Sequence, residues 1–280
     1  MVRNNTVDPT KALLLGATGR LGAMIRTGWP EKGGLLCQSR VPREGHVAFD
    51  LLADPDSAIA AMRGAGAVVC LSGVTPLRAA RDGSDLSLNV DLAVAAAGAG
   101  RVFLASSAAV YGAADGTLSE DAPCAPLSDY GRSKLDMERV ALRLAADLGQ
   151  PATVLRIGNV AGADAILGGW REGMQLDRFA DGTTPARSYI GPLTLARIVH
   201  ALCCRRELPE VINIAAPGVV HMGALLDAAD LPWHPRPAPP EAIARVSLDT
   251  KRLEEQVRFA AQDSTPGGMV SEWRYFNAQE

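Results

Sequence analysis

The chain has 280 residues, enough for one large α/β domain or for one domain with a small second lobe. Hydrophobic residues make up 48% and charged residues 21%, a balance typical of globular proteins and not of disordered chains. A net charge of −3 excludes the basic surface that most nucleic-acid-binding proteins need. Residues 1–9 lack the apolar core of a secretory signal, and no apolar run reaches the roughly 20 residues of a membrane span. We expect a cytoplasmic protein that binds a small molecule, without nucleic-acid or membrane partners.

Short apolar segments alternate with helical ones through the first half of the chain, which indicates a parallel sheet with crossover helices. The predicted strands are apolar on both faces, as strands covered by helices on both sides must be: 12–15, 35–38, 47–49, 67–71, 102–105 and 153–157. The predicted helices are 55–63, 86–99 and 129–148, and Val140, Leu144 and Leu148 should share the buried face of the last one.

This pattern predicts a Rossmann-type, doubly wound α/β fold followed by a less regular C-terminal lobe. Residues 1–160 form the expected nucleotide-binding domain, to which 186–216 should return. Residues 161–185 and 217–280 form the expected substrate-binding lobe. Five scattered cysteines without CxxC spacing and four separated histidines predict reduced thiols and no metal site.

A glycine-rich turn follows the first predicted strand directly. Gly16, Gly19 and Gly22 are spaced GxxGxxG at the point where a strand should turn into a helix. Glycine allows a tight turn, close approach of the backbone to a pyrophosphate, and close helix–strand packing. The triplet alone is also compatible with a simple glycine-rich turn, but its place after the first strand favours a dinucleotide site.

The residues after the second predicted strand suggest which dinucleotide binds. A carboxylate usually holds the adenosine ribose there, but this chain has Gln38, Ser39 and Arg40. Ser39 and Arg40 would bind a 2′-phosphate, which a carboxylate would repel, so we expect NADP in preference to NAD. The alternative is that Arg40 is an ordinary solvated loop charge.

Tyr130 and Lys134 are four residues apart on a predicted helix, so their side chains project from one face. A nearby ammonium group lowers the pKa of a phenol, which could then exchange a proton with an alcohol or carbonyl oxygen. Ser107 lies at the end of a predicted strand, where its hydroxyl could orient a carbonyl group. Together these residues predict hydride-transfer chemistry.

With these motifs in place, the sequence resembles the extended short-chain dehydrogenase/reductase family, the NAD-dependent epimerase/dehydratase group. The resemblance rests on the glycine loop, on Ser107, Tyr130 and Lys134, and on the segment from Arg156 to Gly162, which matches RxxNxxG. It implies catalytic roles for those three residues, with support from Asn89. It also implies cofactor contacts from these residues as well as Tyr130 and Lys134: Gly16, Thr18, Gly19, Arg20, Leu21, Gly22, Ser39, Arg40, Asp50, Leu51, Leu71, Ser72 and Gly73.

The resemblance further implies that Asn159 and Arg187, together with Ser107, bind the substrate. Asn159 and Arg187 match positions that face the diphosphate of a nucleotide sugar in epimerases of the group. A guanidinium suits a phosphate better than other side chains do. The alternative is that Arg187 pairs with a surface carboxylate such as Asp181.

The chain also departs from the group. The dehydratases carry an Asp-Glu pair directly after the catalytic hydroxyl residue, where this chain has Ala108 and Ala109, which transfer no protons. We therefore expect an NAD(P)-dependent oxidoreductase or epimerase, most plausibly acting on a nucleotide sugar and without dehydratase activity. The alternatives are a reductase of small carbonyl compounds and a non-catalytic NADP-sensing protein. A homodimer is an open possibility for its assembly.

Overall fold

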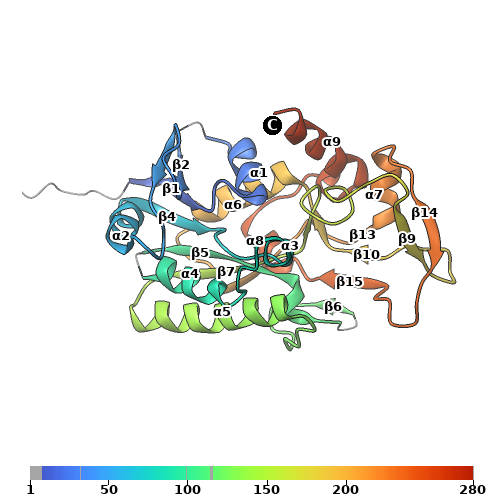
Figure 1. Ribbon diagram of the computed structural model, residues 1–280, viewed down its shortest axis with the longest axis horizontal. Coiled ribbons are helices and arrows are strands. Elements are labelled where there is room, and N and C mark those ends of the chain that lie inside the picture. Colours follow the sequence, from blue (N-terminus) through green and yellow to red (C-terminus); the bar gives the residue numbers. More distant parts are fainter. Residues whose placement is uncertain (1–7, 32, 99, 114–115, 280) are drawn as a thin grey trace, which may run out of the picture.

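The computed structural model describes residues 8–31, 33–98, 100–113 and 116–279 (Figure 1). At its centre is a seven-stranded parallel sheet with the strand order β12-β7-β5-β4-β1-β2-β3. The strands are β1 (Asp8–Leu15), β2 (Leu35–Ser39), β3 (His46–Ala48), β4 (Ala65–Cys70), β5 (Val102–Ser107), β7 (Ala152–Ile157) and β12 (Val211–Ile214). The chain runs from β1 to β2 on one side and returns to β4 on the other. The strand order therefore reverses between β1 and β4, where ligands bind in open α/β sheets.

Helices cover both faces of this sheet, as the doubly apolar strands predict (Figure 1). One face carries α1 (Arg20–Gly28), α6 (Pro192–Cys203), α8 (Lys251–Gln256) and α9 (Pro266–Asn277). The other carries α2 (Pro55–Arg63), α4 (Leu88–Ala97) and α5 (Asp129–Asp147). Alternate residues of β1 serve the two layers: Leu14 packs with the first group of helices, and Leu13 and Leu15 with the second. The predicted Rossmann-type fold is confirmed.

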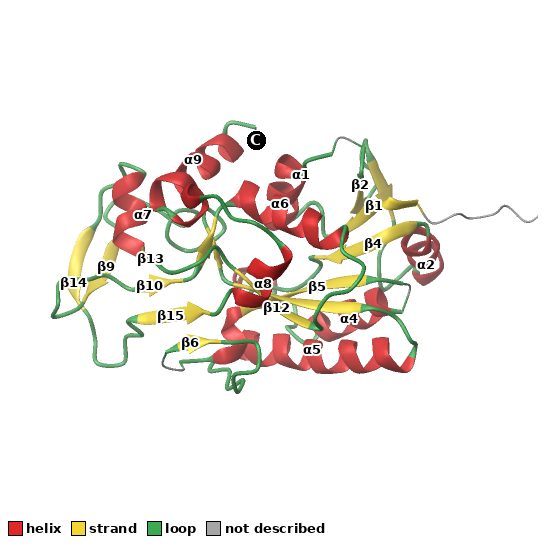
Figure 2. Ribbon diagram, turned by 180° about the vertical axis from the view of Figure 1, so that it is seen from behind, coloured by secondary structure: helices red, strands yellow, loops and turns green. Residues whose placement is uncertain are grey.

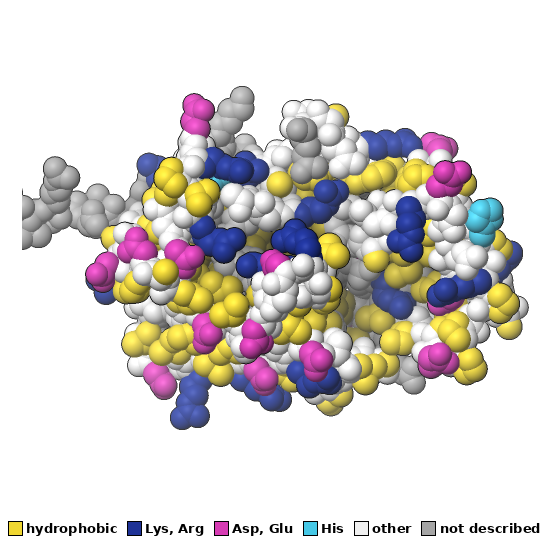
Figure 3. Space-filling model, viewed as in Figure 1, with side chains coloured by type: hydrophobic (Ala, Val, Ile, Leu, Met, Phe, Trp, Pro, Cys, Tyr) yellow, Lys and Arg dark blue, Asp and Glu magenta, His cyan; other side chains and the backbone are white. Residues whose placement is uncertain are grey.

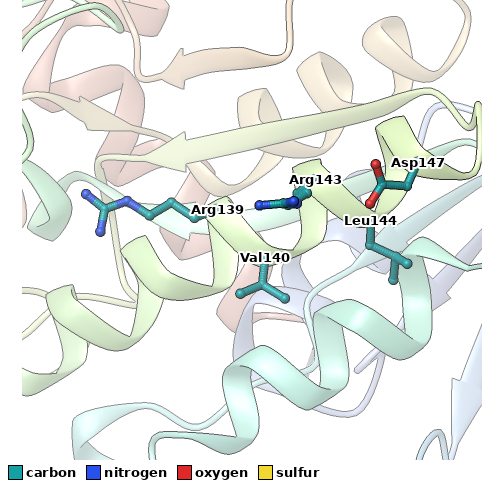
Figure 4. Close-up of a pocket in the computed structure, with 5 residues that line it drawn as sticks. All are labelled: Arg139, Val140, Arg143, Leu144 and Asp147. Carbon is teal, nitrogen blue, oxygen red and sulfur yellow. The ribbon is translucent and has the colours of Figure 1, made fainter.

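Helix α5 starts where the sequence predicts, because the Ser128 hydroxyl accepts a hydrogen bond from the Gly131 amide at 3.1 Å. Its predicted buried face is wrong for Val140 and Leu148, whereas Leu144 is partly buried and packs against the core on this side of the sheet. Val140 and Leu148 are 44% and 50% exposed, and Val140 and Leu144 line a shallow outer groove with Arg139, Arg143 and Asp147 (Figure 4). The buried positions are instead Gly131, Lys134, Leu135, Met137, Glu138, Ala141 and Ala145. Two charged residues, Lys134 and Glu138, thus lie on the buried face of α5. A search for apolar side chains does not find them.

The remaining elements are short, and many of them form a lobe beside the carboxyl ends of the strands (Figure 2). Its four-stranded sheet has the order β13-β10-β15-β6, and β11 pairs with β8 and β14 with β9. The elements are α3 (Pro76–Asp82), η1 (Ala108–Tyr111), β6 (Thr117–Leu118), β8 (Asn159–Val160), β9 (Gln175–Arg178), β10 (Ala186–Arg187), β11 (Tyr189–Ile190), β13 (Val220–His221), α7 (Met222–Ala228), β14 (His234–Pro237), β15 (Arg245–Leu248) and η2 (Ala261–Ser264).

The segment 186–216 is divided between the two parts of the molecule. Helix α6 and strand β12 lie in the large α/β unit, whereas β10 pairs with β13 and β15 in the lobe. Helices α8 and α9, which follow residue 217, contribute Leu253 and Phe276 to the core of the α/β unit. Among the described residues, no helix is long and apolar enough to span a membrane, and no group of His, Cys, Asp or Glu could hold a metal ion.

Candidate active site

The glycine turn lies at the reversal point of the sheet. Gly16 has φ +76°, and a Cβ there would lie 2.8 Å from the Ser72 amide nitrogen after β4. A Cβ on Gly22 would lie 2.4 Å from the Gly16 carbonyl oxygen, so helix α1 can pack here only through glycine. Thr18 and Gly19 are exposed, and Gly19 precedes the first turn of α1 without a side-chain cap. Free amides at a helix start suit a phosphate group.

The side chains around this turn include two of the expected cofactor residues on α1. Arg20 donates from Nε to the Gly162 carbonyl oxygen at 2.6 Å, and its guanidinium lies 5.6 Å from the centre of the Phe276 ring. Leu21 packs against the apolar core, as does Leu71 at the end of β4. Arg20 therefore links the glycine turn to the segment after β8 and to α9, a connection that the sequence did not predict.

The end of β2 has no carboxylate beside the glycine turn. Gln38 is buried there, accepting from the Gly16 amide at 3.2 Å and donating to the Phe49 carbonyl oxygen at 2.6 Å. Ser39 is also buried and donates to the Val41 carbonyl oxygen at 2.7 Å, whereas Arg40 is exposed. The glutamine amide thus braces the turn from a position where an acid usually holds the ribose.

Two further expected cofactor residues follow β3. Asp50 accepts from the amides of Leu52 and Ala53 at 3.0 Å each, which holds the pKa of its carboxyl below its usual range, with a smaller effect from Arg40. Leu51 is buried in the core between the sheet and α2. Arg40 and Asp50 therefore lie close enough to interact across the β2–β3 edge.

Tyr130 and Lys134 project from α5 toward the ends of β4 and β5, as their spacing predicts. The Lys134 ammonium lies 6.0 Å from the centre of the Tyr130 ring and donates to the Ala105 carbonyl oxygen at 2.9 Å. Burial lowers the pKa of Lys134 to about 8, although Cys70 and Glu138 act in the opposite direction. At neutral pH the lysine is therefore still mostly charged.

Ser107 ends β5 and approaches Tyr130. Its Oγ accepts from the Ala109 amide at 3.2 Å, so the hydroxyl also caps η1. Burial raises the pKa of Tyr130, and its hydrogen bond with Ser107 acts in the opposite direction. The expectation that Lys134 lowers this pKa is thus not met in this structure, because burial dominates.

Asn89 supports this set from α4. Its amide is buried, accepts from the Val74 amide at 2.9 Å and donates to Ser133 Oγ at 3.0 Å. A Cβ on Gly73 would lie 2.7 Å from Asn89 Oδ1 and 3.3 Å from Lys134 Nζ. Gly73, in the segment after β4, thus lies directly against Asn89 and Lys134, and a larger residue there would displace Asn89.

Asn159 and Arg187 are brought together through Tyr189. Strand β8 pairs with β11 so that Asn159 lies opposite Tyr189. The side chains of these two residues share a hydrogen bond. Arg187 lies two residues before Tyr189 in the chain. Arg187 is half-buried and donates to the carbonyl oxygens of Ala186 and Ile243 at 2.8 and 3.0 Å. Burial lowers its pKa. Asp181, the alternative partner, instead accepts from Thr183, so the surface pair does not form.

A buried polar cluster, which the sequence analysis did not identify, lies behind Tyr130, Lys134 and Ser107. Glu138, one turn beyond Lys134 on α5, is 2% exposed and bonds with Ser106 and Arg156. An acidic residue eight positions after Tyr130 and four after Lys134 must share their helix face, so its spacing was a usable signal.

Part of the chain matches a known protein family and two related proteins in sequence. The model of a family described as the NAD dependent epimerase/dehydratase family matches residues 12–169, more than half of the chain. A UDP-glucose 4-epimerase of Azospirillum brasilense is 40% identical over 107 residues, which are 38% of this chain and 31% of that protein. One from Corynebacterium glutamicum is 40% identical over 81 residues, 29% of this chain and 25% of that protein. The matched stretch thus spans less than a third of either relative.

Solved structures match nearly the whole chain. A UDP-glucuronic acid 4-epimerase from Bacillus cereus, in complex with UDP-glucuronic acid and NAD, has a TM-score of 0.73 at 18% identity, covering 96% of this chain and 100% of that one. A UDP-glucose-4-epimerase from Stenotrophomonas maltophila, with bound NAD and formylated UDP-arabinopyranose, has a TM-score of 0.73 at 20% identity, covering 96% and 98%. At these identities the likeness shows the shared fold.

Proposed function

The chain belongs to the NAD dependent epimerase/dehydratase family, and from this membership we propose that it is an NAD(P)-dependent epimerase or oxidoreductase acting on a nucleotide sugar. The observation that carries the proposal is the meeting of Ser107, Tyr130 and Lys134 beside Gly73, at the edge of the sheet where the glycine turn lies. A phenol, an ammonium and a hydroxyl in that place can manage the proton of a sugar hydroxyl group.

The chain's own residues supply proton transfer and orientation. Tyr130 takes the proton from the reacting hydroxyl oxygen or returns it to the carbonyl oxygen, and Ser107 holds that oxygen by a hydrogen bond. The Lys134 ammonium favours the phenolate form once a substrate oxygen is present to share the proton. A dinucleotide held at the glycine turn would supply the hydride transfer. In an epimerase the hydride returns to the same substrate, and in a reductase it leaves with the product.

The residues present fit a dinucleotide. Gly16 and Gly22 leave no room for side chains, and the exposed residues Thr18 and Gly19 at the start of α1 would lie against the pyrophosphate. Since Gln38 places an amide where an acid usually stands, and Arg40 is exposed beside it, we favour NADP. The solved structures cited above contain NAD, so the proposal of NADP depends on the residues at this chain's β2 end alone.

For the substrate we favour an anionic group held near Arg187. Among the described residues, this half-buried guanidinium forms no ion pair with a carboxylate and donates hydrogen bonds to two carbonyl oxygens. On one face of the molecule, Lys and Arg side chains lie across the middle and the right, and Asp and Glu side chains lie mainly toward the edges (Figure 3). A diphosphate would neutralise the charge of Arg187. We assign residues 161–185 and much of 217–280 to the substrate lobe on this basis.

We also keep a homodimer as a proposal, formed through the outer face of α5. Val140, Leu144 and Leu148 lie along this face with Arg139, Arg143 and Asp147, so a second copy in antiparallel orientation would bring charges of opposite sign together (Figure 4). Light scattering on the wild type and on Val140→Asp tests it. A wild-type dimer that the aspartate converts to a monomer supports this surface, and a monomeric wild type refutes it.

The function is tested by incubating the purified chain with NADP or NAD and a panel of UDP- and dTDP-hexoses, with products resolved by NMR. Interconversion of 4-epimers without net cofactor change supports the epimerase. Consumption of NADPH with small carbonyl compounds alone would favour the reductase, and cofactor binding without turnover the sensing protein. Because Ala108 and Ala109 carry no proton-transferring group, we expect no 4-keto-6-deoxy product. Arg187→Ala should raise KM for the nucleotide sugar and leave cofactor affinity unchanged.

A further inference from the structure

A chain of buried polar groups lies directly behind the candidate catalytic residues. Glu138 is 2% exposed, accepts a short hydrogen bond from Ser106 Oγ and pairs with Arg156 through an Nη2–Oε2 distance of 2.8 Å. Arg156 Nε lies 3.2 and 3.1 Å from the two carboxylate oxygens, so the guanidinium engages Glu138 through two of its nitrogens. Ser106 and Arg156 are buried as well.

This carboxylate joins the two elements that hold the catalytic groups. Glu138 is one turn after Lys134 on α5, and its partner Ser106 directly precedes Ser107 on β5. Lys134 itself donates to the carbonyl oxygen of Ala105, the next residue back along β5. Two adjacent contacts therefore fix the helix that carries Tyr130 and Lys134 against the strand end that carries Ser107.

The same chain of bonds continues into the substrate lobe. Arg156 Nη1 donates to Tyr111 Oη and to the Glu120 carbonyl oxygen, both at 3.0 Å, and Tyr111 donates to Asn213 Oδ1 at 2.7 Å. The Asn213 amide then donates to the carbonyl oxygens of Leu118 and Asp249 at 2.9 and 3.0 Å. Leu118 lies in β6, which pairs with β15, and β15 pairs with the strand that carries Arg187.

Stability alone is a weak reason for this arrangement. Replacing a buried ion pair by well-packed apolar side chains is often neutral or stabilising, because two charges must be removed from water. A buried ion pair is better explained when it holds the surrounding residues in one arrangement among several. Here that arrangement is the spacing between Ser107 on one element and Tyr130 with Lys134 on another, and a misplacement of about 1 Å in such a set can cost roughly 100-fold in rate.

We propose that Glu138 is a positioning residue: it holds Ser107 at a fixed distance from Tyr130 and Lys134 and, through Arg156, connects them to the lobe that binds the substrate. The proposal rests on the proposed function for its kinetic consequences. Its electrostatic consequence concerns Lys134, which is also approached by Cys70 from β4 and by the Tyr130 ring. Near Glu138 itself, the charged or titratable groups are Arg156, Lys134 and Cys124.

Three variants of the full chain separate position from charge. Glu138→Gln keeps the size of the side chain but removes its charge, so kcat should fall about 10- to 100-fold with KM within roughly twofold. In Glu138→Gln, the alkaline limit of kcat, which is the pH above which kcat falls, should be lower than in the wild type. The reason is that Lys134 then loses its proton more readily. Ser106→Ala removes the strand contact but keeps the charge, so kcat should fall while the alkaline limit stays in place. Asp136→Asn, on the exposed side of α5, is the matched control and should match the wild type.

A measurement independent of turnover distinguishes this inference from the proposed function. The chain has four lysines, at 11, 32, 134 and 251, so an NMR titration of isotope-labelled lysine can resolve Lys134. Glu138→Gln should lower the pKa of Lys134, and Ser106→Ala should leave it unchanged. If the wild type converts no substrate, the proposed function fails, and the titration still decides the electrostatic link. Wild-type kinetics and an unchanged Lys134 pKa in folded Glu138→Gln would overturn the inference. If Glu138→Gln does not fold, normal kcat in folded Ser106→Ala overturns it.

Discussion

The two ends of the candidate site are built in different ways. At the catalytic end, Lys134, Asn89 and Glu138 are buried, and each is held by at least one hydrogen bond from another element. At the adenosine end, Gln38 is equally buried, but Arg40 is exposed on a turn after β2. The chemical groups are thus held by hydrogen bonds inside the protein, whereas the group proposed to bind the ribose phosphate is exposed to solvent.

This difference has a physical reason. Proton transfer requires reacting atoms within a few tenths of an ångström of their working positions, so preorganisation there directly lowers the barrier. A 2′-phosphate at the rim needs only an attractive charge that follows it, and an exposed guanidinium suffices. We therefore expect substitutions at the catalytic end to have large effects on rate and stability, and those at the adenosine end to have modest effects on affinity.

The largest effect should come from Tyr130→Phe. The variant removes only the hydroxyl that would carry the proton, so turnover should fall by about 10²- to 10⁴-fold, the range of general acid–base catalysis. Fold and cofactor affinity should be nearly unchanged, as checked by circular dichroism and cofactor fluorescence. Tyr275→Phe, at an exposed tyrosine of α9, is the control. Normal turnover of Tyr130→Phe on a verified substrate would show that the mechanism is wrong.

A smaller effect, on stability, should follow from Lys134→Met. Burial lowers the Lys134 pKa from 10.5 to about 8, so at pH 7 the folded chain holds a charge that costs about 3 kcal/mol relative to the unfolded one. Removing the charge should stabilise the chain by about 2 kcal/mol at pH 7, because the lost bond to Ala105 takes back about 1 kcal/mol. The variant should nevertheless be inactive.

The stability difference between Lys134→Met and the wild type should depend on pH. Between pH 8 and 10.5 the unfolded wild type keeps the Lys134 proton that the folded one has lost, so wild-type stability rises with pH and the advantage of the variant shrinks. Urea unfolding at pH 7, 8.5 and 10 measures the change, with Lys251→Met at an exposed lysine as control. A gap that widens with pH would contradict the assignment.

Local sequence patterns predict part of the fold and part of the candidate site. Period and spacing predict the central strands, the start of α5 at Asp129 and the shared face of Tyr130 and Lys134, because these follow from local geometry. The buried face of α5 was mispredicted, since Glu138 is buried by partners on β5 and β7 that are distant in sequence. Val140 and Leu148 are apolar, yet they are exposed. Burial of a charge depends on its partner, and a partner from another element is not encoded in local spacing.

The adenosine end should show the smallest effect, in Arg40→Ala. If Arg40 contacts the 2′-phosphate, NADP should bind more tightly than NAD in the wild type, and the variant should narrow that difference. We expect about 1–2 kcal/mol, or roughly 5- to 30-fold in Kd, which is below the full value of a charge-assisted bond because the side chain is exposed. Affinity for NAD, which lacks the phosphate, should not change. Fluorescence titration of both reduced cofactors measures this, with Arg63→Ala at the exposed end of α2 as control. The difference should also shrink as salt rises, since an exposed pair is screened. A wild type that prefers NAD would refute the assignment, and would mean that Gln38, braced between Gly16 and Phe49, leaves the ribose site neutral without favouring a phosphate.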